Sequence, residues 1–468
     1  MTESAAMTPV NASAIPAERL NTSARLTACD FLRLLGRGEI TVAEYATACA
    51  DVVDELEASV HAWVHFDRMA FLAKAAEMDA AIANGDGELT SNRLFGVPIG
   101  VKDIFNTADM PTQHGSKLFE GYQPGNDARV VTNVRRDGAL IAGKTVTAEF
   151  AVHASQGTRN PYDFDRASGT SSSGSAVAVA TGMVPMALAS QTAGSTIRPA
   201  SYCGIYGFKP SFGLIPRTAM LKTTDTLDTV AFMARSVEDL SLMFEIQRVR
   251  GPNYPIVDRE MNDRSRYAID NRAWRVGLLN GPKSHLESPR VKEGMKRVAQ
   301  RLGDAGCRVE EAQLPPSFTN AYEIHETIYR KALSYYFRTE WRHDRSQFSE
   351  ALTHMIEAGE TISTEEYLSA TAAQTVLANA FDQWMSDYDI LLTPSAADDA
   401  PLETVGTDVA DHSLLFTMCY APSISVPVLS GTAGLPVGVQ IASRRFNDYL
   451  LLQFTDLLSH AYDRAETV

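Results

Sequence analysis

Cysteine is scarce in this chain and carries no pattern. Only five of the 468 residues are cysteine, and no two of them form a CxxC pair. Isolated cysteines match neither the disulfide framework of small secreted domains nor the spacing of a zinc site. The ten histidines show no ligand spacing either. We therefore expect no metal site and no other cofactor. The five cysteines are Cys29, Cys49, Cys203, Cys307 and Cys419.

Positive charge is also in deficit. The formal net charge is -15 and the pI is near 5.2, and no basic stripe is visible along the sequence. Proteins that bind nucleic acids usually carry a basic patch or stripe. We therefore expect a small-molecule substrate, no nucleic-acid partner and no membrane partner, with assembly into a homodimer left open.

The first twenty residues lack the features of an export signal. They contain no basic segment followed by an apolar one, so the expected location is the cytoplasm. The chain is 45% hydrophobic and 21% charged, which is typical of a globular protein with a large core. We expect residues 1–23 to form a disordered or loosely packed tail and residues 24–465 to form a single large domain.

The most informative absence is that of charge between Arg166 and Arg198. A bilayer span needs only ~20 apolar residues, but the many hydroxyls of this segment would be unpaired in lipid and Pro185 would interrupt a helix. The segment is better interpreted as a core element in which backbones approach closely. Its two serine- and glycine-rich clusters, 169–175 and 191–195, flank a predicted helix and a short predicted strand.

The rest of the chain predicts a layered α/β protein. Thr41 and Glu44 form a capping box at the start of a helix. A strand at 275–279, a helix at 289–305 and a strand at 308–311 make a unit that is typical of this class. Residues 318–385 are predicted to be helical and rich in aromatic side chains, and this excursion could cover a substrate.

One motif points to a nucleotide. Residues Gly138–Thr145 match GxxxxGK[ST], which in a phosphate-binding loop follows a strand and opens a helix. Here the four residues between the glycines are themselves apolar and strand-like. A strand cannot also wrap phosphates with its N–H groups, so nucleotide binding is kept only as a minor alternative.

The residues themselves suggest a serine nucleophile with an unusual base. Ser195 follows Ala-Gly in a tight turn, where N–H groups can converge on an oxyanion. A serine hydroxyl needs a base, and no histidine is close in sequence. Lys102 follows a short apolar strand, where burial would lower its pKa and favour the neutral amine. A serine between them could relay the proton, and Ser171, Ser172 and Ser173 are all candidates.

These segments together resemble the amidase signature family. The resemblance covers about residues 25 to 460 in the family's order, which makes a chance match negligible. The family's motifs stand at 96–103, 138–150, 169–175, 191–200, 203–210, 389–394, 425–427 and 434–440.

The resemblance implies a single layered α/β domain with a central mixed sheet flanked by helices. It also implies a Ser-cisSer-Lys triad. The nucleophile falls on Ser195, the relay serine after a cis peptide on Ser171, and the lysine on Lys102. The oxyanion hole maps to the backbone N–H groups of Thr192, Ala193, Gly194 and Ser195.

Three departures from the family pattern stand close to these positions. Thr170 replaces a glycine beside the expected cis bond, Gln191 replaces an aspartate, and Ile197 replaces its arginine partner, with Arg198 one place later. Thr170 and Phe150 are the residues we expect in the substrate pocket.

We therefore expect an enzyme, an amidohydrolase that cleaves the C–N bond of a linear amide, hydrazide, carbamate or ester through an acyl-enzyme. The alternative is the A subunit of a tRNA-dependent glutamine amidotransferase, which would need partner subunits.

Overall fold

The computed structural model describes residues 23–85, 92–266, 273–403 and 412–463. The tail expected at residues 1–23 therefore lies outside the described residues, except for Ser23. That residue begins a short 3-10 turn, Ser23–Arg25, which leads into the first helix.

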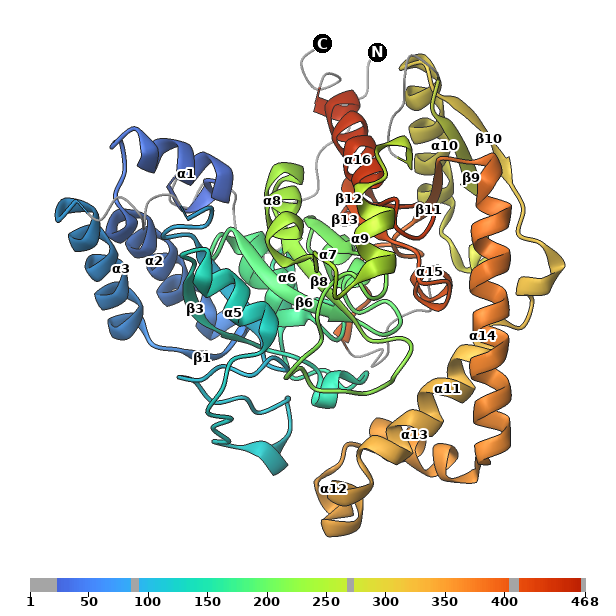
Figure 1. The fold of residues 1–468 in the computed structure, drawn as a ribbon, viewed down its shortest axis with the longest axis horizontal. Helices are drawn as coiled ribbons and strands as arrows, with labels where there is room; N and C mark the ends of the chain where they lie inside the picture. The colour runs from blue at the N-terminus through green and yellow to red at the C-terminus, as the bar shows by residue number, and fades with distance from the viewer. Residues whose placement is uncertain (1–22, 86–91, 267–272, 404–411, 464–468) are drawn as a thin grey trace, which may run out of the picture.

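A mixed sheet of eleven strands runs through the described part of the chain, in the order β1-β3-β2-β6-β8-β7-β12-β13-β11-β9-β10 (Figure 1). β2 is parallel to both β3 and β6, whereas β6, β8, β7 and β12 pair antiparallel. This confirms the predicted fold class. The strands are β1 (Trp63–Phe66), β2 (Pro98–Lys102), β3 (Leu140–Thr145), β6 (Met186–Gln191), β7 (Tyr206–Lys209), β8 (Thr229–Ala234), β9 (Arg275–Leu279), β10 (Arg308–Ala312), β11 (Ile390–Pro394), β12 (Ser423–Ser430) and β13 (Pro436–Ala442).

Helices cover the sheet, and their ends follow the local sequence signals. The Thr41 side chain accepts the Glu44 N–H, and the Glu44 side chain accepts the Thr41 N–H, so the predicted capping box is present. The helices packed around the sheet are α1 (Ala28–Gly36), α2 (Val42–Val60), α3 (Arg68–Ala83), α5 (Arg129–Arg136), α8 (Val237–Gln247), α9 (Pro255–Asn262), α10 (Pro289–Asp304), α15 (Ser413–Met418) and α16 (Asp448–Asp463).

The uncharged segment lies in the centre of the molecule. It forms α6 (Ser173–Thr181) and then β6, and it ends at the first residue of α7 (Ile197–Tyr202). A side chain at Gly174 would put its Cβ 2.3 Å from both the Ala62 carbonyl oxygen and the Val146 nitrogen. Close backbone approach therefore explains the small residues, as predicted. The sequence indicated a tight turn at Ser195 and no helix after it, whereas the structure begins α7 at Ile197.

No helix in the described ranges is long and apolar enough to cross a bilayer.

The nucleotide-loop interpretation of Gly138–Thr145 is wrong. Residues 140–145 form β3, which pairs with β1 on one side and with β2 on the other. Its N–H groups are therefore held in the sheet. The Lys144 amine is fully buried, forms an ion pair with Asp103 at 3.0 Å and donates to the Thr112 hydroxyl at 2.7 Å. The motif is a structural strand with a paired core lysine.

The predicted helical excursion is present and projects from the sheet as a lobe (Figure 1). It consists of α11 (Ala321–Tyr336), α12 (Arg338–His343), α13 (Glu350–Thr361) and α14 (Thr364–Trp384). Its aromatic side chains form a second hydrophobic cluster that also contains Phe150.

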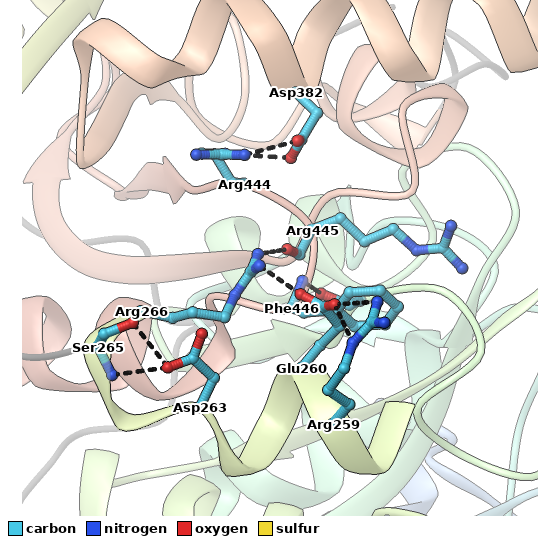
Figure 2. A network of polar contacts seen from close by, with 10 residues as sticks. Arg259, Glu260, Asp263, Ser265, Arg266, Asp382, Arg444, Arg445 and Phe446 are labelled. Atoms are coloured by element: carbon cyan, nitrogen blue, oxygen red, sulfur yellow. Dashed lines mark hydrogen bonds and ion pairs between the residues drawn. The ribbon is translucent and has the colours of Figure 1, made fainter. Parts of the chain in front are cut away.

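Polar contacts fix α14 and α9 to the loop after β13 (Figure 2). The Arg444 guanidinium contacts both carboxylate oxygens of Asp382 on α14, at 3.1 and 2.7 Å. Beside it, Arg266 pairs with Glu260 on α9 and donates to the Arg445 carbonyl at 2.8 Å. Bidentate arginine–carboxylate contacts restrict orientation as well as distance, so the base of the lobe is held against the sheet.

Candidate active site

Lys102 ends β2 inside a ring of serine hydroxyls. Its amine contacts the Oγ atoms of Ser171 and Ser172 at 2.8 Å each, and that of Ser190 at 2.9 Å. A neutral amine has two N–H bonds and one lone pair, so one of these three hydroxyls must donate to the nitrogen. The Ser172 hydroxyl donates to the Ser190 carbonyl at 3.2 Å. Ser171 and Ser190 therefore remain as donors to Lys102.

Burial favours the neutral form of this amine. The Lys102 side chain is fully buried, and its desolvation holds the pKa well below the usual lysine value, opposed in part by the negative charge of Asp228. Among the described residues no carboxylate forms an ion pair with Lys102, in contrast to Lys144 with Asp103. A neutral lysine can accept a proton, which is what a general base requires.

Two backbone contacts bring the serine clusters together. Ser171 follows a cis peptide bond from Thr170, and its carbonyl accepts the Ala148 N–H at 3.1 Å. The next N–H, that of Ser172, donates to the Ser195 carbonyl at 3.3 Å. Ser171 is only 2% exposed, whereas Ser195 is half-buried. Of the three residues predicted from sequence, Ser195 is thus the most exposed.

In the loop after β6, the backbone carbonyls of three successive residues, 192–194, each contact a hydrogen-bond donor. The Thr192 carbonyl contacts His325 Nε2 at 3.0 Å, the Ala193 carbonyl accepts the Thr417 hydroxyl at 2.9 Å, and the Gly194 carbonyl accepts the Arg198 N–H at 3.0 Å.

In a trans peptide the C=O and the following N–H point in opposite directions. Fixing these three carbonyls therefore turns the N–H groups of Ala193, Gly194 and Ser195 the other way. No acceptor within the described residues takes these three N–H groups or that of Thr192. Unpaired backbone N–H groups of this kind are the donors that an oxyanion hole requires.

The Gln191 side chain makes hydrogen bonds at the place where the family pattern has an aspartate paired with an arginine at 197. Its side-chain oxygen accepts the N–H groups of Thr196 and Ile197 at 3.0 and 3.1 Å, and its Nε2 donates to the Thr417 hydroxyl at 3.1 Å. Both ends of the amide hold the loop, while Ile197 is fully buried. The loop after β6 is therefore held by hydrogen bonds of an uncharged side chain, although positions 191 and 197 lack the charged residues of the family pattern.

Sequence reasoning missed several residues of this arrangement. Ser190 contacts the lysine, and Asp228 accepts the Thr192 hydroxyl at 2.8 Å. His325 and Thr417 reach the loop from α11 and α15. No local pattern marks them, because each acts across a large separation along the chain.

The two predicted pocket residues lie in different surroundings. Phe150 is fully buried, with its ring centroid 4.6 Å from that of Phe337 in the helical lobe. Thr170 is half-buried next to the cis bond. A role for either in substrate binding stays a prediction. No group of three or more His, Cys, Asp or Glu side chains in the described ranges could hold a metal ion.

We expect His325 to position the Thr192 carbonyl, and a substitution can test this. Burial lowers the pKa of His325 to about 4, so at neutral pH the ring is uncharged and its Nε2–H donates to the Thr192 carbonyl. His325→Ala should free that carbonyl and lower kcat by about tenfold to a hundredfold with a smaller change in KM, because oxyanion donors act mainly in the transition state. Steady-state kinetics of His325→Ala and His325→Asn would measure this, with partial rescue expected for asparagine.

The matched control is His343→Ala, an exposed histidine on α12. A parallel loss in both variants, or a change in KM alone, would rule out the positioning role.

The groups gathered here are those that acyl transfer requires: an accessible hydroxyl, a buried amine and free N–H groups. An arrangement of this kind is what an enzyme acting on a carbonyl compound needs. The family model named Amidase matches residues 44–452, and the chain belongs to this family.

Known relatives cover nearly the whole chain. The A subunit of the glutamyl-tRNA(Gln) amidotransferase of Halothermothrix orenii is 29% identical, over 93% of this chain and 97% of its own. A solved amidase structure superposes with a TM-score of 0.82 at 24% identity, over 93% of this chain and 100% of its own. The peptide amidase of Stenotrophomonas maltophilia gives a TM-score of 0.77 at 24% identity, over 95% and 97%. These two structures support the fold.

The comparisons correct the expectation about partners. A small-molecule substrate alone, with no nucleic acid, is contradicted by relatives that are named as amidotransferase subunits for glutamyl-tRNA(Gln). The error has a physical source: net charge is a property of the whole chain, and an acidic total does not exclude a local basic surface.

Proposed function

We propose that the protein cleaves the C–N bond of a carboxamide through an acyl-enzyme on Ser195. The observation that carries this proposal is the buried Lys102 amine, 2.8 Å from the Ser171 hydroxyl and without a carboxylate partner among the described residues. A neutral amine at this place can draw a proton through Ser171 from the accessible serine.

In acylation, Ser195 Oγ attacks the amide carbon while its proton passes to Ser171, whose own proton passes to Lys102. The carbonyl oxygen gains the negative charge and accepts from the N–H groups of the 192–195 loop. Lys102 then returns its proton through Ser171 to the leaving nitrogen, and the C–N bond breaks. Desolvated donors of this kind typically contribute several kcal/mol to the transition state.

In deacylation, water attacks the ester carbon along the same route. Its proton passes to Ser171 and Lys102, the ester C–O bond breaks, and Ser195 recovers a proton. The products are a carboxylic acid and ammonia or an amine, and the amino-acid side chains end as they began.

For the setting of this chemistry, we propose that the protein acts as the A subunit of a tRNA-dependent amidotransferase, with glutamine as the amide. The full-length match to relatives of that name supports this assignment over an independent amidase. Partner subunits would then receive the ammonia and hold the tRNA.

A second candidate is an independent hydrolase for linear amides with apolar acyl groups. One observation favours it: Tyr329 on α11 packs against both His325 and His153, beside the carbonyl of Thr192. The helical lobe thus presents aromatic side chains next to the loop.

A substrate panel separates the two settings. Purified protein would be incubated with glutamine, aliphatic amides and anilides, and intact mass would report the acyl group on Ser195. Glutamine as the only good substrate, with ammonia production raised by copurifying subunits, supports the amidotransferase. Rapid turnover of apolar amides by the chain alone would overturn that assignment, and the absence of any acyl-enzyme with every amide would overturn the chemistry.

A further inference from the structure

A cavity lined by arginines lies outside the catalytic centre. Its volume is about 440 Å³, and five arginines line it, with Glu245 as the single lining carboxylate. In a chain of net charge -15 such a concentration of one positive side chain is unusual. The arginines are Arg93, Arg129, Arg136, Arg248 and Arg250.

Hydrogen bonds fix the walls of this arginine cavity. α5 and the end of α8 are joined by Gln247, which donates to the Val130 carbonyl at 2.8 Å and accepts from Asn133 at 3.2 Å. The N–H of Arg129 donates to the Thr218 carbonyl at 3.1 Å. The backbone around Arg129, Arg136 and Arg248 is therefore held in place.

Internal pairing leaves positive charge in excess. Asp137 contacts Arg93 at 2.9 Å and Arg136 at 3.5 Å, and Glu245 pairs with Arg250 and lies 3.5 Å from Arg248. These two carboxylates serve four arginines. Arg129 is exposed, and no carboxylate within the described residues pairs with it.

Arg248 is the least exposed of these arginines. Its side chain is only 9% exposed, its Nε lies 3.5 Å from Glu245 Oε1, and its guanidinium carbon lies 5.6 Å from the centroid of the Tyr449 ring. It therefore adds positive charge to the wall of the cavity, whereas Arg129 and Arg136 are exposed and can reach a ligand.

We propose that this cavity binds phosphate groups. Guanidinium groups recognise phosphate through paired hydrogen bonds, and the volume accommodates a group the size of a di- or triphosphate. The phosphates could belong to a free phosphorylated small molecule or to an RNA backbone, which present the same chemistry. The site lies on α5 and α8, and the proposal does not depend on the catalytic function proposed above.

The test is a titration of the full chain with inorganic tripolyphosphate, followed by calorimetry at low salt, and in parallel with a short RNA hairpin, followed by fluorescence anisotropy. Arg129→Ala combined with Arg136→Ala should weaken tripolyphosphate binding by about tenfold or more, because charge-assisted hydrogen bonds are lost. Both side chains are exposed, so the fold should be retained.

The matched control is Arg37→Ala combined with Arg342→Ala, which removes the same charge from exposed sites outside the cavity. Tripolyphosphate binding that only the cavity variant loses, with no hairpin binding, supports the site with a small phosphorylated ligand. Hairpin binding that is lost in the same variant and displaced by tripolyphosphate supports it with RNA. Absence of tripolyphosphate binding to the wild type, or equal losses in both double variants, would overturn the proposal.

Discussion

Ser195→Ala is expected to abolish turnover, with kcat lowered on the order of 10⁴-fold or more and no acyl-enzyme visible by mass spectrometry. Loss of a catalytic serine removes the covalent route entirely, and the residual rate comes only from binding and oxyanion stabilisation. The substitution deletes one oxygen from a half-buried side chain, so thermal unfolding should stay close to that of the wild type.

Ser173→Ala is the matched control for this experiment. Ser173 belongs to the same uncharged segment, but its hydroxyl lies 3.3 Å from Thr158 Oγ1 rather than beside Lys102. We expect near-normal kcat in this variant. Turnover that persists in Ser195→Ala, or that vanishes equally in Ser173→Ala, would show that the nucleophile has been misassigned.

Local sequence signals predicted much of the fold for a physical reason. A capping box such as Thr41 with Glu44 is satisfied within one helical turn, so neighbouring residues determine it. The same holds for the strands predicted at 275–279 and 308–311, which lie within β9 and β10. The small residues of 169–175 are visible in the sequence too, but the contacts that require a glycine at 174 are with distant backbone, the Ala62 carbonyl oxygen and the Val146 nitrogen.

The parts that sequence reasoning missed depend on contacts between distant residues. His325 and Thr417 orient the carbonyls of a loop more than 130 residues earlier in the chain. Neither has a local signature, because a histidine on an amphipathic helix is ordinarily a packing residue. The arginine cavity was invisible for the same reason, since its side chains come from three separate regions of the chain.

The motif at 138–145 shows the opposite problem: here a local sequence pattern is present, but the structure it usually predicts is not. Its letters match a phosphate loop, but the conformation that gives such a loop its function is absent. Gly143 pairs with Phe66 of β1 and with Gly100 of β2, and a side chain there would meet the His65 carbonyl oxygen. The glycine thus permits tight strand packing, and the adjacent lysine balances a buried carboxylate.

Replacement of Lys102 should separate catalysis from stability. Lys102→Met removes the proton acceptor and should lower kcat by orders of magnitude, while relief of the desolvation of the amine offsets part of the three serine contacts that are lost. Lys144→Met should do the reverse, because it leaves the Asp103 carboxylate buried and unpaired. That loss is expected to lower the free energy of unfolding by about 3–5 kcal/mol. Chemical denaturation and steady-state kinetics on both variants would measure the contrast, and an unstable Lys102→Met protein or a fully active one would contradict it.

The pH dependence gives the second test of Lys102. Burial lowers the pKa of Lys102, so kcat/KM should rise with pH as this amine loses its proton and then level off. Lys102→Arg, whose side chain stays charged at every accessible pH, should be inactive throughout.

The free energy of unfolding should also depend on pH through the protonation of Lys102. Between the folded pKa of Lys102 and the ordinary lysine value, the unfolded chain binds a proton that the folded chain does not. The contribution of Lys102 to the free energy of unfolding therefore increases with pH across that window. Lys102→Met should lack this component, measured as the difference between the two unfolding profiles. An identical pH profile of stability in wild type and Lys102→Met would mean that the buried amine keeps its proton, and a protonated lysine could not serve as the base for Ser171.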